Sequence, residues 1–316
     1  MKTQIADWLF LYNTIQQVID NNLNIKLKIF YFTLEMSKEE KMLAAFSNIL
    51  YIKEGIRIAP KDLRSTKADK VLSQESLDLI AKYKPYFDKI EEIVEFVDDI
   101  RNPTGIFKFV RSYAYANGTQ HKKTIEIKGE KVEIDDWYEA NDPEEYVMVI
   151  IDHISLIQAE SSGGRAMNLH ESIVKLSSDY LIRLRNKYNY IPVVVQQQSA
   201  AQESVDNMKV GRLKPTMDGL GDCKLTQRDA NVILGLFSPF RHEIKEYFGY
   251  DTTFFKDNIR FLEILGGREG GGGTTAPLYF DGAVNYFQEL PKSNDAERMA
   301  KVMQFLTNMR KAHERR

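Results

Sequence analysis

The feature that most constrains the fold of this chain is an apolar run that ends in an aspartate. Residues 147–152 read VMVIID, with five consecutive apolar side chains before Asp152. A strand with one face in solvent alternates apolar and polar residues, whereas a continuous apolar run is typical of a strand covered on both faces, as in a parallel sheet. Residues 191–195, IPVVV, repeat the pattern. The two runs favour an α/β fold.

Helical and strand patterns alternate along the rest of the chain, which predicts a doubly wound, mostly parallel sheet with flanking helices. Further strands are expected at 28–33, 231–237 and 259–265, and helices at 4–22, 37–51 and 170–187. Residues 118–140 alternate about a Lys-Gly turn and predict an inserted β-hairpin. We therefore expect one α/β domain over residues 1–290, which includes this hairpin, and a C-terminal amphipathic helix within 291–316.

Composition narrows the classes of function. The formal net charge is -2, so any contact with nucleic acid must come from local loops rather than from a basic surface. The single cysteine, Cys223, excludes a disulfide within the chain and fits a reducing cytoplasm, that of a bacterium or of a phage-infected host. No run of about 18 apolar residues occurs, so we expect no transmembrane helix and no membrane partner.

Two carboxylates follow predicted strands, at the sheet edge where α/β folds bind ligands. Asp152 ends the apolar run and could orient Mg²⁺ at a nucleotide. Glu35, in the segment FYFTLEMS, could activate a water molecule for attack on a γ-phosphate. Each also has a simpler interpretation, because Asp152 could cap a turn and Glu35 could sit at a helix start.

Two more strand ends carry suitable polar groups. Gln198 closes IPVVVQQQ, where an amide could sense a γ-phosphate and relay its presence to the next loop. Arg268 follows a strand in LEILGGREG and could act as an arginine finger on a pliable glycine-rich loop. Taken singly, the first is also compatible with a solvated strand end and the second with a flexible surface loop.

Taken in order, these segments resemble one family, the DnaB-type replicative DNA helicases. FTLEMS, VIIDHISLI, PVVVQQQ, LKPTMDGLGDCKLTQRDANVIL and LEILGGREG are similar to five of its motif segments and extend across nearly the whole chain. The resemblance implies a RecA-like fold and ATP-dependent unwinding of duplex DNA. The sequence departs from the family at Gly266, where the family has lysine, and in the hairpin, which has no counterpart. Such divergence suits a phage helicase.

The family resemblance also gives a meaning to the first residues. The family's phosphate-binding loop reads G-x-x-x-x-G-K-T and leads directly into a helix. Here Lys2 and Thr3 precede a helix at the family's spacing, with Met1 where the second glycine would be. We expect the chain to begin within that loop. Because the glycine-rich turn supplies most of the phosphate-binding amides, we expect this polypeptide to bind ATP poorly and to hydrolyse it negligibly.

The resemblance implies a role for each candidate residue. Lys2 would contact the β- and γ-phosphates of ATP, and Thr3 and Asp152 would hold Mg²⁺. Glu35 would activate water and Gln198 would sense the γ-phosphate. Arg268 would act on the nucleotide of the neighbouring subunit, which implies a homo-oligomer, typically a hexameric ring.

In such a ring, single-stranded DNA would pass through the centre. Two loops would hold it, one near 159–168 with Arg165 and one near 201–225 with Lys209, Arg212 and Lys224. A primase or a helicase loader is a further expected partner.

Two other functions remain open from the sequence. A RecA- or RadA-like recombinase shares these ATPase elements but forms filaments on DNA. A non-catalytic, oligomerising DNA-binding module that has lost its phosphate loop would also explain the missing glycines. The motor interpretation depends on one geometric expectation, that Glu35, Asp152 and Gln198 lie at neighbouring strand ends along the same edge of one parallel sheet, around a space sized for a triphosphate.

Overall fold

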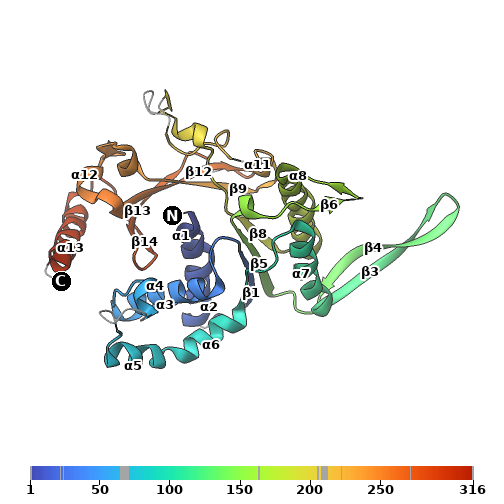
Figure 1. Cartoon of the computed structure of the whole chain (residues 1–316), viewed down its shortest axis with the longest axis horizontal. Coiled ribbons are helices and arrows are strands. Elements are labelled where there is room, and N and C mark those ends of the chain that lie inside the picture. Colours follow the sequence, from blue (N-terminus) through green and yellow to red (C-terminus); the bar gives the residue numbers. More distant parts are fainter. Residues whose placement is uncertain are drawn as a thin grey trace.

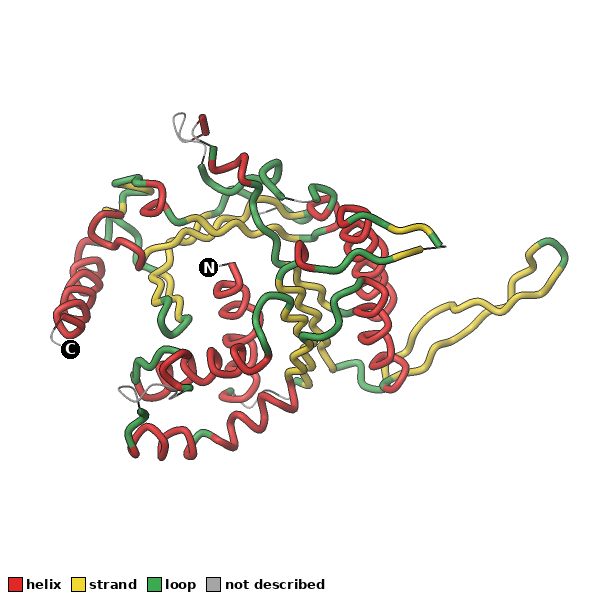
Figure 2. The backbone as a smooth tube through the Cα atoms, viewed as in Figure 1, coloured by secondary structure: helices red, strands yellow, loops and turns green. Residues whose placement is uncertain are grey.

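The computed structural model describes residues 2–21, 23, 25–64, 71–162, 164–204, 206–207, 213–221, 223–270 and 272–314. Its frame consists of two four-stranded sheets with helices packed around them (Figures 1 and 2). The N-terminal helix lies between the two sheets. On that helix, Leu11 and Ile15 pack against the first sheet, and Ile5 packs against Phe280 and Phe287 of the second. The start of the chain is therefore enclosed by both halves of the domain.

The first sheet is parallel throughout and has the strand order β2-β1-β5-β8. Its strands are β1 (Lys26–Thr33), β2 (Val94–Val97), β5 (Glu145–Asp152) and β8 (Ile191–Val194). Val149, Ile150 and Ile151 are fully buried. The apolar run of β5 is covered on both faces because helices pack on each side of the sheet, which confirms the α/β prediction.

Helices cover this sheet in two groups. One face carries η1 (Asp7–Tyr12), which continues α1 (Lys2–Ala6), and with it α2 (Asn13–Asp20), α3 (Lys38–Glu54) and α6 (Lys84–Ile93). The other face carries α7 (Pro103–Ala116) and the continuous helix formed by α8 (Leu169–Val174), η4 (Lys175–Leu181) and α9 (Ile182–Tyr188). Ser37 begins α3 through a reciprocal capping box with Glu40, so the turn after β1 is fixed.

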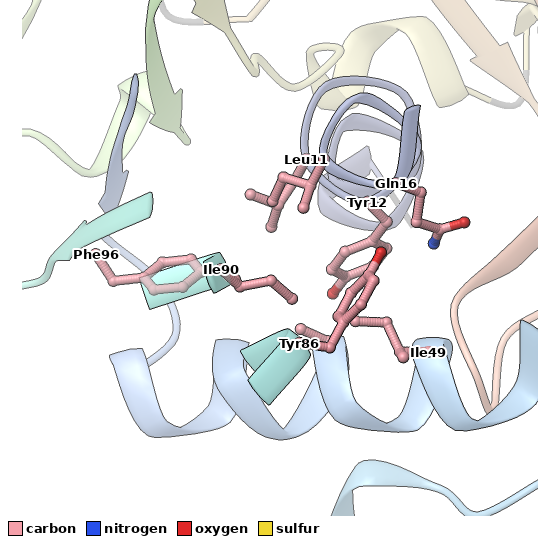
Figure 3. Close-up of a pocket in the computed structure, with 9 residues that line it drawn as sticks. Leu11, Tyr12, Gln16, Ile49, Tyr86, Ile90 and Phe96 are labelled. Carbon is pink, nitrogen blue, oxygen red and sulfur yellow. The ribbon is translucent and has the colours of Figure 1, made fainter. Parts of the chain in front are cut away.

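A small gap remains where η1, α2, α3 and α6 meet (Figure 3). Leu11, Ile49 and Ile90 line it together with Tyr12 and Tyr86. Because the gap offers only about 10 Å³, close to the space of a single water molecule, we interpret it as imperfect core packing and not as a ligand site.

The second sheet is antiparallel, with the order β14-β13-β12-β9. Its strands are β9 (Val232–Phe237), β12 (Ile259–Gly267), β13 (Thr275–Asp281) and β14 (Tyr286–Glu289). The strands predicted at 231–237 and 259–265 are present, but their expected place in the parallel sheet was wrong, because they pair antiparallel in this second sheet. The short connections β12–β13 and β13–β14 join antiparallel neighbours, and β9 is an edge strand on which Val232 is 59% exposed.

The inserted hairpin is present, as predicted. It consists of β3 (Gly118–Ile127) and β4 (Glu130–Ala140), and it projects from the body of the domain (Figure 1). At the opposite end of the molecule, α13 (Ala296–Glu314) packs on the second sheet through Met299 and Leu306.

Short elements complete the described chain. They are α4 (Pro60–Leu63), α5 (Gln74–Lys82), η3 (Ile154–Leu156), β6 (Ser161–Ser162), β7 (Arg165–Ala166), η5 (Ala200–Glu203), α11 (Thr226–Asp229), η6 (Pro239–His242), β10 (Glu246–Tyr247), β11 (Tyr250–Asp251), α12 (Thr252–Phe255) and η7 (Lys256–Asn258). Among the residues described, no helix is both long and apolar enough to cross a bilayer.

Candidate functional site

The candidate site lies at the carboxyl edge of the parallel sheet. Thr33 of β1 pairs with Asp152 of β5, and Ile151 pairs with Val194 of β8. The three neighbouring strands therefore end at the same level, and Glu35, Asp152 and Gln198 follow those ends. The three residues therefore share one sheet edge, as the sequence interpretation requires, and the space for a triphosphate between them stays a prediction.

The N-terminal helix begins at this same edge and brings Thr3 to Asp152. The hydroxyl of Thr3 donates a hydrogen bond to Oδ1 of Asp152 at 3.0 Å, although the two residues are 149 positions apart. Lys2 is the first residue of α1, directly before Thr3. A hydroxyl oxygen and a carboxylate oxygen are hard donors, which Mg²⁺ prefers. The pair therefore fits a magnesium ion that takes its other ligands from phosphates and water.

The second oxygen of Asp152 belongs to a buried polar network. Oδ2 of Asp152 accepts from Nζ of Lys41 at 2.9 Å, and the hydroxyl of Tyr31 lies 2.9 Å from the same oxygen. Nζ of Lys41 also lies 3.0 and 3.1 Å from the carboxylate oxygens of Asp7 and 2.6 Å from the hydroxyl of Tyr31. All four residues are at most 2% exposed. An ammonium has three N–H donors, and here each has an acceptor.

The charges in this network are unequal in number, with two carboxylates for one ammonium. Burial raises the pKa of Asp7, and the nearby Lys41 only partly offsets this effect. Burial, together with Asp7 and Asp152, holds the pKa of Tyr31 well above its ordinary value, so its hydroxyl stays protonated near neutral pH. With Oδ2 engaged by Lys41, Asp152 presents Oδ1 to Thr3, and its orientation is fixed.

Sequence reasoning missed Asp7, Tyr31 and Lys41. One signal was available for Lys41, which is buried on α3 together with Ala44, Ala45 and Asn48, at the helical spacing of a core-facing stripe. A lysine at such a position needs a buried partner. The identity of the partner is decided by tertiary packing, because Asp7 and Asp152 lie on other elements.

Glu35 is the more exposed carboxylate of the site, with 55% of its side chain accessible. Its Oε2 lies 3.9 Å from Nε2 of His153, and that nitrogen lies 3.3 Å from Nε2 of Gln197. The ends of β1, β5 and β8 thus meet through these three side chains. A solvent-accessible carboxylate in this position can accept a proton from a water molecule. His153 and Gln197 were not among the predicted site residues.

Gln198 points toward the following loop. Its Nε2 donates to the backbone oxygen of Thr216 at 3.2 Å, and its backbone forms a β-bridge with Leu220. A Cβ added at Gly219 would collide with Oε1 of Gln198, so this glycine permits the close approach. Gln198 therefore ties the sheet edge to residues 213–221, while Gln197 is the glutamine that contacts His153.

The remaining candidates lie apart from this cluster. Arg268 follows β12 in the second sheet, and its Nη2 donates to the backbone oxygen of Arg228 at 3.0 Å. Arg165, on β7, is 79% exposed and pairs with Glu171 at 2.9 Å. Lys224 is exposed. Lys209 and Arg212 lie outside the described residues.

Within the part of the chain that the structure describes, no three histidine, cysteine, aspartate or glutamate side chains converge on a metal position. An all-protein metal cage is therefore not present there. Mg²⁺ in phosphate-transfer sites usually binds one or two protein oxygens and completes its shell with phosphate oxygens and water. The Thr3–Asp152 pair has the composition of such a site.

No protein-family model and no curated protein match this chain in sequence. Solved structures do match it. A DnaB-like replicative helicase, whose structure is described with its interactions with primase, superposes with a TM-score of 0.60 at 17% identity over 90% of this chain. A second solved structure, described as an ATPase domain, superposes with a TM-score of 0.57 at 17% identity, and the match covers 89% of this chain and 80% of that domain.

The match spans only 55% of the DnaB-like helicase. At this level of identity the likeness establishes the fold. The parallel four-stranded sheet, its flanking helices and the sequence motifs all agree with it. The chain therefore has a RecA-like α/β fold, which it shares with the DnaB-like replicative helicase and with the ATPase domain.

Proposed function

We propose that this chain is the motor domain of a ring-shaped replicative helicase that moves along single-stranded DNA and unwinds the duplex by hydrolysing ATP. The observation that carries the proposal is the 3.0 Å hydrogen bond between Thr3 and Asp152. It joins the start of α1 to the end of β5 at the edge where Glu35 also lies. Nucleoside triphosphatases of this class pair a hydroxyl and a carboxylate around Mg²⁺ in the same way.

Each residue at this edge has a task in the proposal. Mg²⁺, when bound with ATP, would neutralise charge that develops on the transferred phosphoryl group. Thr3 and Asp152 would hold the ion, and Lys2 would contact the β- and γ-phosphates. Glu35 would take a proton from the attacking water, because its carboxylate is accessible and close to the end of β5.

Oligomerisation completes the proposed site. Arg268 follows β12 of the second sheet, and its side chain donates a hydrogen bond to the backbone oxygen of Arg228, away from Thr3 and Asp152. We therefore assign Arg268 to the nucleotide of a neighbouring subunit. Gln198 is bonded to the loop that contains Thr216, and this bond would link the state of the nucleotide to the proposed DNA-binding loop. That loop carries Lys209, Arg212 and Lys224, and β7 carries Arg165. A cytoplasmic location and a primase or loader as partner belong to the same proposal.

The test places a phosphate-binding loop directly before Lys2. A polypeptide in which a strand and a G-x-x-x-x-G segment replace Met1 and lead straight into Lys2 and Thr3 should bind Mg-ATP and hydrolyse it. Glu35→Gln should lower turnover by about 100-fold or more while nucleotide binding is kept. Glu39→Gln, an exposed carboxylate of the first turn of α3, is the matched control and should be neutral. Electron microscopy of the extended protein should show closed rings, whereas filaments would indicate a recombinase.

One observation favours a second candidate, a non-catalytic oligomerising DNA-binding module. The ammonium of Lys41 is already bonded to Oδ2 of Asp152, so a cation occupies one side of the proposed metal ligand. If the extended polypeptide forms rings and binds single-stranded DNA but binds no Mg-ATP, the module is the correct description and the motor proposal is wrong.

A further inference from the structure

The two carboxylate oxygens of Asp152 have different surroundings. Oδ1 accepts the hydrogen bond of Thr3 at 3.0 Å, at the start of α1. Oδ2 accepts from Nζ of Lys41 at 2.9 Å and lies 2.9 Å from the hydroxyl of Tyr31. Asp152, Tyr31 and Lys41 are each at most 1% exposed. The inner oxygen is therefore already bonded to buried groups of the protein, and only Oδ1 is directed at the proposed metal position.

Lys41 is held in place by more than its bond to Asp152. Its Nζ also lies 3.0 and 3.1 Å from the two carboxylate oxygens of Asp7, and 2.6 Å from the hydroxyl of Tyr31. An exposed lysine can swing away from a carboxylate at little cost. If Lys41 moved, the buried carboxylate of Asp7 would lose its cation, which is strongly unfavourable. The ammonium is therefore a fixed neighbour of Oδ2.

Mg²⁺ and Ca²⁺ differ in what they require of a carboxylate ligand. Mg²⁺ demands a near-ideal octahedral shell and keeps several water molecules, so a single oxygen from one carboxylate is enough. Ca²⁺ binds about six to eight oxygens in a flexible shell and often takes both oxygens of one carboxylate. An ion that used both oxygens of Asp152 would share Oδ2 with the ammonium of Lys41, and two cations on one oxygen repel each other.

We infer that Lys41 restricts Asp152 to one available oxygen and in this way sets the preference of the nucleotide site for Mg²⁺ over Ca²⁺. The inference rests on the proposed function and deepens it by naming the residue that selects the ion. Lys41 is a positioning residue, because it acts on the ion through Asp152. Thr3 on α1 and Lys41 on α3 bond opposite oxygens of the carboxylate, so it cannot turn to fit a larger and less regular shell.

The charge of Lys41 also weakens the attraction of Asp152 for any divalent cation, and the experiment must separate this effect from selection. Mg²⁺ and Ca²⁺ carry the same charge, so repulsion by the ammonium changes both affinities in the same direction and to a similar extent. The dissociation constant with Ca²⁺ divided by that with Mg²⁺, here called the selectivity ratio, cancels most of this common effect. A change in the ratio therefore reports on the oxygens that Asp152 supplies.

The test measures the selectivity ratio in the polypeptide that carries the added phosphate-binding loop and the rest of this chain. The probe is a fluorescent, non-hydrolysable ATP analogue, titrated at saturating Mg²⁺ and at saturating Ca²⁺, so the readout is binding and not turnover. Lys41→Met alone leaves two buried carboxylates without their ammonium. The variant to measure is therefore Asp7→Leu with Lys41→Met, which removes an anion together with the cation. We expect its ratio to be about tenfold lower than that of wild type, because Ca²⁺ gains the second oxygen of Asp152.

Two controls show whether the effect belongs to the ammonium. Lys38→Met removes an exposed lysine from the same helix and keeps the buried network, so its ratio should equal that of wild type. Asp7→Asn disturbs the network but leaves the ammonium of Lys41 on Oδ2 of Asp152, and it should also keep the wild-type ratio.

The outcomes distinguish this inference from the proposed function. If the double variant has the wild-type ratio, or loses binding equally with both ions, Lys41 does not select the ion and the motor proposal stands. A ratio that falls as far in Asp7→Asn as in the double variant would overturn the inference as well, because the ammonium is still present. Failure of the unsubstituted extended polypeptide to bind the analogue with either ion would contradict the inference and the proposed function together.

Discussion

Replacing Lys41 with methionine tests the buried network most severely. The substitution keeps the approximate length of the side chain and removes the ammonium that is bonded to both Asp7 and Asp152. These carboxylates are 2% and 1% exposed, so neither can be solvated in place. Removing one partner of a buried ion pair costs about 3–5 kcal/mol, because the remaining charge stays uncompensated.

That loss is a large fraction of the stability of an ordinary domain, which is about 5–15 kcal/mol. Urea unfolding followed by tryptophan fluorescence is a suitable assay, because Trp8 lies next to Asp7 in η1. The matched control is Lys38→Met, an exposed lysine at the start of the same helix, which should change the free energy of unfolding by less than about 0.5 kcal/mol.

A double variant separates lost charge compensation from lost packing. Asp7→Leu combined with Lys41→Met removes an anion together with the cation, so it should recover about 1–3 kcal/mol relative to Lys41→Met alone. If Lys41→Met unfolds within about 1 kcal/mol of wild type, the ammonium does not hold these carboxylates and the description of the network is refuted.

Two further predictions concern the polar loops. Burial raises the pKa of Glu160, but hydrogen bonds from Lys175 and Thr104 outweigh it and hold the pKa at about 2, below the ordinary 4.5. Because the folded pKa is the lower one, this carboxylate stabilises the fold above about pH 4.5, and that contribution is lost as the pH falls toward 2. Glu160→Gln should therefore cost about 2 kcal/mol at pH 7 and progressively less in urea titrations at lower pH, and an equal cost at pH 7 and pH 3 would contradict this. For DNA, Arg165→Ala and Lys224→Ala should each lower the salt dependence of single-strand binding by about 0.7 in the slope of log K against log salt, measured by fluorescence anisotropy, and an unchanged slope would remove that residue from the DNA path.

The parallel half of the fold could be predicted because its strands leave a strong signal. The run that ends at Asp152 is apolar at every position, and only a strand covered on both faces permits this. The start of α3 was equally clear, since Ser37 and Glu40 form a capping box that is determined locally. The inserted hairpin was visible from its alternation and its turn. In each of these cases the deciding interactions lie within a short stretch of sequence.

The second sheet could not be assigned correctly from the same reasoning. The segments 231–237 and 259–265 are apolar enough to suggest buried parallel strands. Their actual pairing depends on which strand each one meets, and that is a tertiary choice. β9 pairs only with β12 and keeps Val232 and Leu234 exposed on its outer part.

The sequence predicted the sheet edge at which the candidate site lies, but not the buried hydrogen-bond network around Asp152. Glu35, Asp152 and Gln198 were placed there because parallel strands end together. The side-chain directions could not be deduced, so Gln198 faces Thr216 while Gln197 meets His153. Lys41 was missed because a lysine on a helix is ordinarily solvated, and only the three-dimensional approach of Asp7 and Asp152 makes its burial favourable.

We assign Thr3 and Asp152 to the metal-binding corner of a nucleotide site, and every role proposed for this edge depends on that corner. Anomalous diffraction from Mn²⁺ in crystals of the glycine-extended polypeptide with a non-hydrolysable ATP analogue tests it most directly. We predict one strong manganese peak beside the Thr3 hydroxyl and Oδ1 of Asp152, with phosphate oxygens in its shell. A nucleotide bound with its manganese elsewhere, or no manganese near Asp152 at saturating nucleotide, would contradict the assignment.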